Sequence, residues 1–396
     1  MVYNFNLGIG WASSGVEYAQ AYRGNILRRA GIDAKFIFTD MFPRENIQHM
    51  TENIGFQDSE IIWLYTFFTD TRIAPVTYTL GQLQNTFGNQ NFTFEREGKK
   101  AKYSFPGSGI YYTVYMVDVR SDRVHRVEMV SGGRLIRKDY FTYCQIYSEY
   151  YAPLDGEAHL YQRRFFNEDG TVAYEEITDD DMVMYQFPDR LIGSKEELVG
   201  LLVSSLNLTA EDTVIIDRTT GIGQAVMQNA GPARLGITIH ADHFSESSTD
   251  EQNILWNNYY EYSFAQYKHI SFYLTATDDQ NRLLREQFKT YMGAEPDVVT
   301  IPVGSLDELK VPENGRKSHS LITASRLASE KHVDWIIEAV TAAREQIPDL
   351  KLDIYGKGGE EKARKELIGK LGCGGFVCLK AQKDLEEVYK RYEAYI

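Results

Sequence analysis

The stretch ITASRLASEKHVDWIIEAV, residues 322–340, decides the fold class. Its apolar start predicts a strand, and the spacing of the apolar residues in VDWIIEAV predicts an amphipathic helix. Arg326 and Lys331 stand at the junction, and in an open α/β sheet ligands bind where strands end and helices begin. This pair could therefore neutralise a diphosphate, or it could be ordinary surface charge at a helix start.

The same rhythm of strand, turn and helix recurs along most of the chain. Residues 2–8 alternate like a strand, a glycine-punctuated turn follows, and VEYAQAYRGNILRRAG has helical spacing. The rhythm continues through TVIID, GIGQAVMQNA and RLGITIHADHF, and later through LKLDIYGKGGEEKARKEL, GFVCL and a last helix, KDLEEVYKRYEAYI. We expect an α/β fold with one Rossmann-like domain over residues 1–74 and 189–305, and a second, partial one over residues 306–396.

Residues 75–188 have a different texture. They alternate aromatic and β-branched residues with polar ones, in segments separated by glycine-containing turns, and NEDGT at 167–171 is typical of a hairpin. We expect an antiparallel β-rich insertion in the first domain.

Composition and charge exclude several classes of protein. The formal net charge of −14 argues against a general nucleic-acid binder. The 3 cysteines form neither a disulfide framework nor a zinc pattern. No signal peptide opens the sequence and no apolar run approaches the ~20 residues of a membrane span, so we expect a cytoplasmic protein.

Two further groups are candidates for chemistry. Gly15 stands at an expected helix start, where the absence of a Cβ permits a close approach by a phosphate; a plain tight turn is the alternative. His240 ends a predicted strand and His243 follows three residues later. No third metal ligand of matching context lies nearby, and structural, catalytic and sugar-binding roles all remain open for His240.

Taken together, GIGWASSGVEYAQAYR, the β-rich insertion, DRTTGIGQA, HADHF and ASRLASEKHVDWIIEA resemble a known family. It is the family of catalytic subunits of the accessory-Sec O-GlcNAc transferases, which glycosylate serine-rich-repeat adhesins in Gram-positive bacteria. These are retaining glycosyltransferases of GT-B fold, in which two Rossmann-like domains bind a nucleotide sugar. The resemblance covers essentially the whole chain.

The resemblance implies a set of donor-binding residues. Residues 15–18 would lie beside UDP, Arg326 and Lys331 would hold its diphosphate, and His240 would contact the transferred sugar. Where the family often has Gly-His at the uracil end, this chain has Ala381-Gln382. The implied site consists of Gly15, Val16, Glu17, Tyr18, His240, Arg326, Lys331, Ala381 and Gln382.

The resemblance also implies the reaction and its partners. GlcNAc would pass from UDP-GlcNAc to Ser or Thr hydroxyls with retention of configuration, without a cofactor and without a metal. A homologous stabilising subunit and a Ser/Thr-rich adhesin would meet the insertion, nucleic acid would not bind, and the enzyme would work in the cytoplasm, with peripheral association at the inner face of the membrane left open. The family's E-x7-E motif is absent, so we expect a truncated second domain.

Two other functions compete with this one. A related transferase acting on a wall polymer such as teichoic acid would share the β-rich insertion. A non-catalytic partner or chaperone subunit would keep the fold and lose the chemistry; the missing E-x7-E favours this reading, whereas Arg326, Lys331 and His240 count against it.

Overall fold

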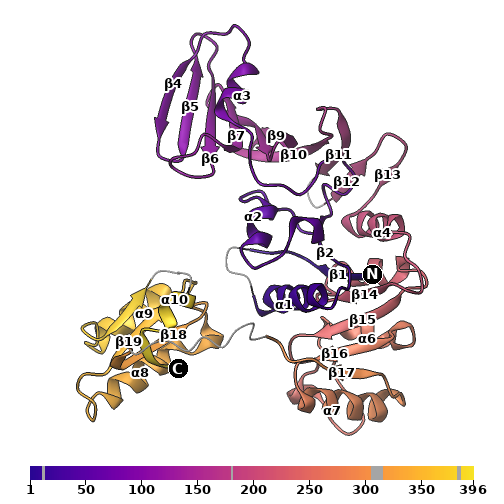
Figure 1. Ribbon diagram of the computed structural model, residues 1–396, viewed down its shortest axis with the longest axis vertical. Coiled ribbons are helices and arrows are strands. Elements are labelled where there is room, and N and C mark those ends of the chain that lie inside the picture. Colours follow the sequence, from indigo (N-terminus) through magenta and orange to yellow (C-terminus); the bar gives the residue numbers. More distant parts are fainter. Residues whose placement is uncertain (11–13, 180–181, 305–314, 381–384) are drawn as a thin grey trace. The chain divides into compact units, whose positions relative to one another are not determined.

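The structure is a computed structural model of the chain and describes residues 1–10, 14–179, 182–304, 315–380 and 385–396. The chain divides into two compact units, Met1–Ser305 and Leu306–Ile396, and each is described by itself. Both contain a parallel sheet, and the first also contains a ten-stranded antiparallel sheet (Figure 1). The predicted α/β fold class with a β-rich insertion is therefore confirmed.

In the described part of the first unit, the parallel sheet has the strand order β17-β16-β15-β14-β1-β2-β3. Its strands are β1 (Val2–Asn6), β2 (Ala34–Phe38), β3 (Ile61–Trp63), β14 (Thr213–Ile216), β15 (Arg234–Ile239), β16 (Phe272–Thr275) and β17 (Val298–Thr300). The chain builds one side of the sheet from β1 outward and, after the insertion, the other side from β14 outward. The strand order thus reverses between β1 and β14, where ligands of such sheets bind.

Helices accompany the strands of this sheet (Figure 1). They are α1 (Gly15–Arg29), α2 (Ile47–Glu52), α4 (Lys195–Ser205), α5 (Gly223–Asn229), α6 (Glu261–Ala265) and α7 (Asp278–Gln287). Helix α1 forms where the sequence supplies a capping box: the Ser14 side chain accepts from Val16 N, and the Glu17 carboxylate accepts from Ser14 N. Its last turn carries Arg28 and Arg29, which suit the negative end of the helix dipole.

The antiparallel sheet is a meander, because its strands are neighbours in the order of the sequence. They are β4 (Thr93–Glu97), β5 (Lys100–Phe105), β6 (Ile110–Met116), β7 (Val124–Ser131), β8 (Arg134–Phe141), β9 (Gln145–Leu154), β10 (Glu157–Phe166), β11 (Val172–Asp179), β12 (Met182–Gln186) and β13 (Leu191–Ile192). The hairpin predicted at NEDGT joins β10 to β11, with Gly170 at φ +83°. Helix α3 (Leu80–Asn85) buries Leu80 and Leu83 in a separate core with β5 to β8.

A stack of aromatic rings fixes the antiparallel sheet to the α/β part of the same unit. Ring centroids lie 4.2 Å apart for Tyr140 and Tyr147 and 4.5 Å apart for Phe165 and Tyr174. Tyr65, which follows β3, stacks on Phe165 at 5.6 Å. These rings belong to the same hydrophobic core as the parallel sheet, so the insertion and the α/β part are one packed body.

The second unit is a smaller α/β layer. Its described strands lie in the order β20-β19-β18-β21 and are all parallel. They are β18 (Lys317–Ala324), β19 (Lys351–Tyr355), β20 (Val377–Lys380) and β21 (Tyr392–Tyr395), with helices α8 (Val333–Ala343), α9 (Glu361–Lys370) and α10 (Glu386–Tyr389).

The predicted helix KDLEEVYKRYEAYI is wrong in its second half. Helix α10 ends at Tyr389, and residues 392–395 form β21 beside β18. The Tyr392 hydroxyl donates to an Asp353 carboxylate oxygen at 2.5 Å, and Ile396 N donates to Ile322 O at 3.0 Å. Pairing with the open edge of β18 satisfies backbone groups that a helix would satisfy internally, so tertiary context overrides local propensity.

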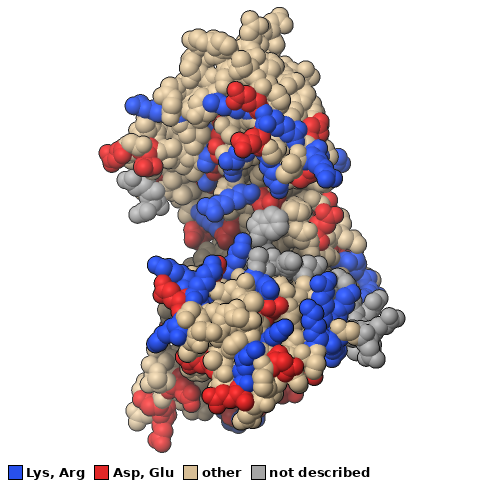
Figure 2. All heavy atoms as spheres, turned by 90° about the vertical axis from the view of Figure 1, so that its left-hand side faces the viewer, with Lys and Arg blue, Asp and Glu red and all other residues tan. Residues whose placement is uncertain are grey.

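The surface carries charges of both signs. The sequence has 42 Lys and Arg against 56 Asp and Glu, and on the face drawn in Figure 2 the basic side chains lie beside acidic ones. Among the described residues, no helix is long and apolar enough to cross a membrane.

Candidate functional site

The N-terminus of α1 combines exposed residues with one buried residue that is hydrogen-bonded to the end of β1. Gly15 and Tyr18 are exposed, whereas the Glu17 side chain is buried and accepts from Ser14 N at 2.5 Å and Asn6 Nδ2 at 3.3 Å. The first turn of α1 therefore cannot shift without breaking contacts to the end of β1.

Gly15 has no structural reason to be glycine within the described residues. A Cβ built on it would have no heavy atom within 4 Å, and its φ is not positive. The packing among the described residues therefore does not require a glycine at this position.

A buried carboxylate, Asp217, lies behind this helix and joins it to His240. Its side chain has no exposed surface, and its two oxygens accept from Arg23 Nη1 and Nη2, both at 2.9 Å. Gln20 Nε2 donates to Oδ2 at 2.8 Å, and His240 Nε2 lies 3.0 Å from Oδ1. Burial alone would raise the pKa of Asp217, but Arg23 and His240 hold it well below its usual range.

His240 follows the last residue of β15 and is fixed at its backbone as well as at its ring. The Tyr260 hydroxyl accepts from His240 N at 3.0 Å and from Ala241 N at 3.1 Å. The His240 side chain keeps 9% of its surface exposed. Asn6 Nδ2 donates to Glu17 Oε1 at 3.3 Å and to Gln20 Oε1 at 3.0 Å. Of the predicted residues 15–18, Glu17 is thus joined to His240 through Asn6, Gln20 and Asp217.

His243 has a different environment. It is buried, its Nε2 lies 2.7 Å from Gln287 Oε1, and its ring stacks on Trp256. Burial lowers the pKa of His243, against the opposing effects of Gln287 and Asp242. These contacts are those of a structural histidine.

The second unit holds Arg326 and Lys331 on a loop after β18. Buried Leu327 anchors this loop, and Leu327 N donates to Lys357 O at 3.0 Å. A Cβ at Gly356 would lie 1.9 Å from Ser325 O, and one at Gly358 would lie 2.2 Å from Leu327 O. The YGKGGE turn therefore needs its glycines, because its backbone packs directly against the loop that carries Arg326.

Both cations are accessible. The Arg326 side chain is 71% exposed and donates to Glu330 Oε1 at 2.7 Å, and Lys331 ends the short 3-10 helix Ser329–Lys331 just before α8. An exposed ion pair of this kind is worth only about 0–1 kcal/mol, so a ligand can recruit Arg326 at little cost.

Not every candidate can be placed, and one contributor was missed. Ala381 and Gln382 lie outside the described residues. Asp217 was not singled out, although it opens the quoted motif DRTTGIGQA and is the last residue of the predicted strand TVIID. Its importance depends on β14 lying between β1 and β15.

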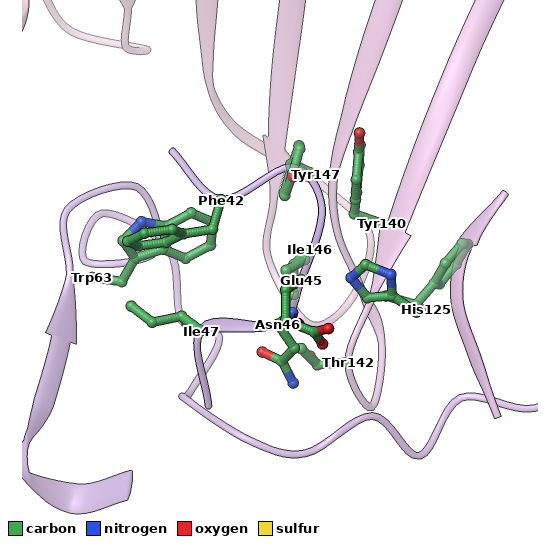
Figure 3. Close-up of a pocket in the computed structure, with 11 residues that line it drawn as sticks. Phe42, Glu45, Asn46, Ile47, Trp63, His125, Tyr140, Thr142, Ile146 and Tyr147 are labelled. Carbon is green, nitrogen blue, oxygen red and sulfur yellow. Dashed lines mark hydrogen bonds between the residues drawn. The ribbon is translucent and has the colours of Figure 1, made fainter. Parts of the chain in front are cut away.

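A separate cavity lies at the junction between the α/β part and the antiparallel sheet (Figure 3). Its volume is about 10 Å³, and it is lined by residues that include Glu45, Trp63, His125, Tyr140 and Tyr147. None of the candidate donor-site residues that the structure describes lines it. Among the described residues, no group of three His, Cys, Asp or Glu side chains is placed to hold a metal ion.

Comparisons with protein families match two parts of the chain. Residues 93–189 match the GtfA extended beta-sheet domain, and residues 307–396 match the glycosyl transferases group 1. The first match coincides with most of the antiparallel sheet, and the second with the smaller α/β unit. The predicted GT-B fold is therefore confirmed.

Individual relatives match along the whole chain. The UDP-N-acetylglucosamine–peptide N-acetylglucosaminyltransferase GtfA subunit of Streptococcus agalactiae is 52% identical over 397 residues, covering 100% of this chain and 78% of the relative. The crystal structure of the pneumococcal O-GlcNAc transferase GtfA in complex with UDP and GlcNAc is 47% identical, with a TM-score of 0.96 and coverage of 100% of this chain and 78% of that one. A crystal structure of a GtfA/B complex matches at 51% identity and a TM-score of 0.87, covering 100% and 79%. The chain belongs to the family of GtfA subunits of UDP-N-acetylglucosamine–peptide N-acetylglucosaminyltransferases.

Proposed function

We propose that this chain binds UDP-GlcNAc and transfers GlcNAc to Ser or Thr hydroxyls of a protein acceptor. GlcNAc transfer to a peptide is the activity for which its relatives are named, and the related pneumococcal structure contains UDP and GlcNAc. The observation that carries the proposal is the network around Asp217. It holds the strand-end His240 in a fixed relation to the open N-terminus of α1.

We assign donor-binding roles to the N-terminus of α1 and, separately, to the loop after β18 in the second unit. The free space at Gly15 admits the UDP moiety beside residues 15–18, where helix N–H groups favour an anion. Arg326 and Lys331 carry the positive charge that a diphosphate requires. When the bond between GlcNAc C1 and the UDP oxygen breaks, negative charge grows on that diphosphate, and these two cations stabilise it without a metal.

We assign the contact with the sugar of UDP-GlcNAc to His240. We assign it a hydrogen bond to the transferred GlcNAc, because it is the partly exposed histidine at the end of β15. The acceptor hydroxyl then attacks C1 from the face that UDP leaves, and the departing phosphate oxygen takes the hydroxyl proton. This front-face course retains the configuration at C1. His243 takes no part.

The antiparallel sheet is the proposed meeting place with other proteins. A related chain has been solved in a GtfA/B complex, and we propose that this chain likewise pairs with a homologous subunit. An extended Ser/Thr-rich adhesin would bind along the same sheet, as peptides add to exposed strands. We place this assembly in the cytoplasm, at the inner face of the membrane, with no role for nucleic acid.

The test is calorimetric titration of UDP into the wild-type chain and into an Arg326→Ala, Lys331→Ala double variant. We expect the double variant to lose about 2 kcal/mol or more of UDP binding, since charge-assisted contacts are removed. The matched control is Lys362→Ala with Lys365→Ala, two exposed cations of α9 that form ion pairs with Glu366 and Glu361. Equal UDP affinity in all three proteins would reject the diphosphate assignment.

Transfer is tested separately. Radiolabelled GlcNAc from UDP-GlcNAc should pass to a Ser-rich peptide when the chain is combined with its partner subunit. Transfer to polyribitol phosphate and not to the peptide would instead identify a wall-polymer enzyme. If UDP does not bind while the partner does, the chain is a non-catalytic subunit.

A further inference from the structure

The Asp217 carboxylate is the centre of this buried network, but none of the donor-binding roles above is assigned to Asp217 itself. It receives hydrogen bonds from two residues of α1, Gln20 and Arg23, and from His240 at the end of β15. Arg23 also donates to Asn4 Oδ1 at 2.8 Å. One side chain thus joins the helix that begins at Gly15 to the histidine assigned to the sugar.

This contact determines which ring nitrogen of His240 carries a hydrogen. Bidentate pairing with Arg23 keeps Asp217 ionised, and an ionised carboxylate can only accept hydrogen bonds. His240 Nε2, 3.0 Å from Asp217 Oδ1, must therefore be the donor. In the neutral ring Nδ1 is then the acceptor, and within the described residues Nδ1 has no hydrogen-bond partner.

We propose that Asp217 is a positioning residue for the transfer: it fixes His240 as the Nε2–H tautomer, so that Nδ1 accepts a hydrogen bond from a hydroxyl of the donor GlcNAc. The partner of a histidine commonly sets its tautomer and orientation in this way. The proposal rests on the proposed function, because it takes His240 to contact the sugar. It adds that the preference for UDP-GlcNAc over UDP depends on a carboxylate that touches neither.

The first experiment reads the tautomer directly. In the full chain labelled with ¹⁵N-histidine, the 8 histidines give ring nitrogen signals that separate protonated from unprotonated nitrogens, and His240→Ala assigns the signal. We expect a protonated Nε2 and an unprotonated Nδ1 in the wild type, and a mixed or reversed tautomer in Asp217→Asn. A wild-type His240 that carries hydrogen on Nδ1, with or without one on Nε2, would overturn the proposal, even if Asp217→Asn does not fold.

The second experiment measures UDP and UDP-GlcNAc affinities by calorimetry in wild type, Asp217→Asn, His240→Ala and the double variant. We expect Asp217→Asn to weaken UDP-GlcNAc about tenfold and UDP less than twofold. In the His240→Ala background, Asp217→Asn should not weaken UDP-GlcNAc binding further, because Asp217 acts through the His240 ring. The control is Asp212→Asn, at the other end of β14, whose carboxylate contacts the N-terminal amine at 3.0 Å; it should leave both affinities unchanged.

The outcomes separate this proposal from the one on which it rests. If Asp217→Asn weakens UDP-GlcNAc equally with and without His240, Asp217 does not act through the ring, and the proposal fails while the donor-site assignment stands. If His240→Ala binds UDP-GlcNAc as the wild type does, the sugar role of His240 fails, whatever the tautomer, and the proposal fails with it.

Discussion

At the scale of single residues, His240 and His243 differ through their partners, although they stand three positions apart. His240 meets an ionised carboxylate, whereas His243 meets the neutral amide of Gln287. Because burial lowers the pKa of His243, this ring stays neutral in the folded chain at neutral pH. Its contribution is to packing and to one buried hydrogen bond.

We therefore expect His243→Leu to affect stability and not the donor site. The substitution leaves Gln287 Oε1 without its partner, which should cost about 1–3 kcal/mol of unfolding free energy. Chemical denaturation measures that loss. Calorimetry should find the ratio of UDP-GlcNAc affinity to UDP affinity unchanged. A tenfold change in this ratio would show that His243 contributes to binding of the sugar.

Some of the candidate site residues could be predicted from the sequence alone. Gly15, His240, Arg326 and Lys331 each stand at a predicted junction of strand, turn and helix, where ligands of α/β folds bind. Asp217 could not be selected in this way, since its role depends on the lateral order of β1, β14 and β15. The local pattern predicts each strand, but it does not say which strands are neighbours.

At the scale of elements, two stacked tyrosines, Tyr140 in β8 and Tyr147 in β9, offer a matched pair of variants. Tyr140 and Tyr147 stack at 4.2 Å and are both buried. The Tyr140 hydroxyl donates to Glu149 Oε2 at 2.8 Å, whereas the Tyr147 hydroxyl has no partner among the described residues. Figure 3 shows both rings at the junction cavity.

Replacing each tyrosine by phenylalanine should give opposite results. Tyr140→Phe removes a hydrogen bond to a buried carboxylate and should lower the unfolding free energy by about 1–3 kcal/mol. Tyr147→Phe removes a buried hydroxyl that lacks a partner and should be neutral or slightly stabilising. Urea denaturation of the two variants compares them directly. A loss of similar size at Tyr147 would show that its hydroxyl is bonded, for instance to a water in the cavity.

The same junction should make the first unit sensitive to acid through His125 in β7. Burial lowers the pKa of His125 to about 4, with Glu45 opposing and Arg126 and His49 adding to the effect. The unfolded chain binds this proton near pH 6.5, so stability is fully present above that pH and falls as the pH drops toward 4. At pH 5 this one group should cost about 2 kcal/mol.

His125→Gln removes the titrating group and serves as the comparison. Denaturation at pH 7 and at pH 5 should show a smaller loss for the variant than for the wild type, by about 2 kcal/mol. The other acidic groups titrate in both proteins and cancel in the comparison. Parallel losses in both would place the pKa of His125 near its ordinary value.

The C-terminal elements show where local patterns stop being sufficient. The charged run EEVYKR favours a helix, and α10 forms within it, but the next residues, YEAY, pair with β18 as the strand β21. A strand of this length is stable only against a partner. The order of the antiparallel sheet was easier to predict, because each of its strands pairs with its neighbour in sequence.

At the scale of the whole molecule, one end of the antiparallel sheet packs on the α/β part of the first unit, and its other end carries a face with tyrosines and basic side chains. Its aromatic core with Tyr65 makes it part of the first unit. Further out, one face of β5 and β6 packs on α3, and the opposite face carries tyrosines under basic side chains. Lys102 Nζ lies 4.4 Å from the Tyr111 ring, and the Arg126 guanidinium 4.1 Å from the Tyr115 ring.

We expect this outer face to contribute to binding of the partner subunit, since Tyr and Arg are the residues that dominate protein interfaces. Tyr111→Ala with Tyr115→Ala should weaken the complex at least tenfold in surface plasmon resonance, while UDP affinity stays within twofold of wild type. Tyr262→Ala with Tyr291→Ala, on the α/β part of the same unit, is the matched control and should leave the complex intact. If the Tyr111→Ala, Tyr115→Ala variant binds the partner subunit as tightly as the wild type does, the partner contact lies elsewhere. The sheet would then serve the acceptor alone, which should appear as a raised KM for the Ser-rich peptide in the same double variant.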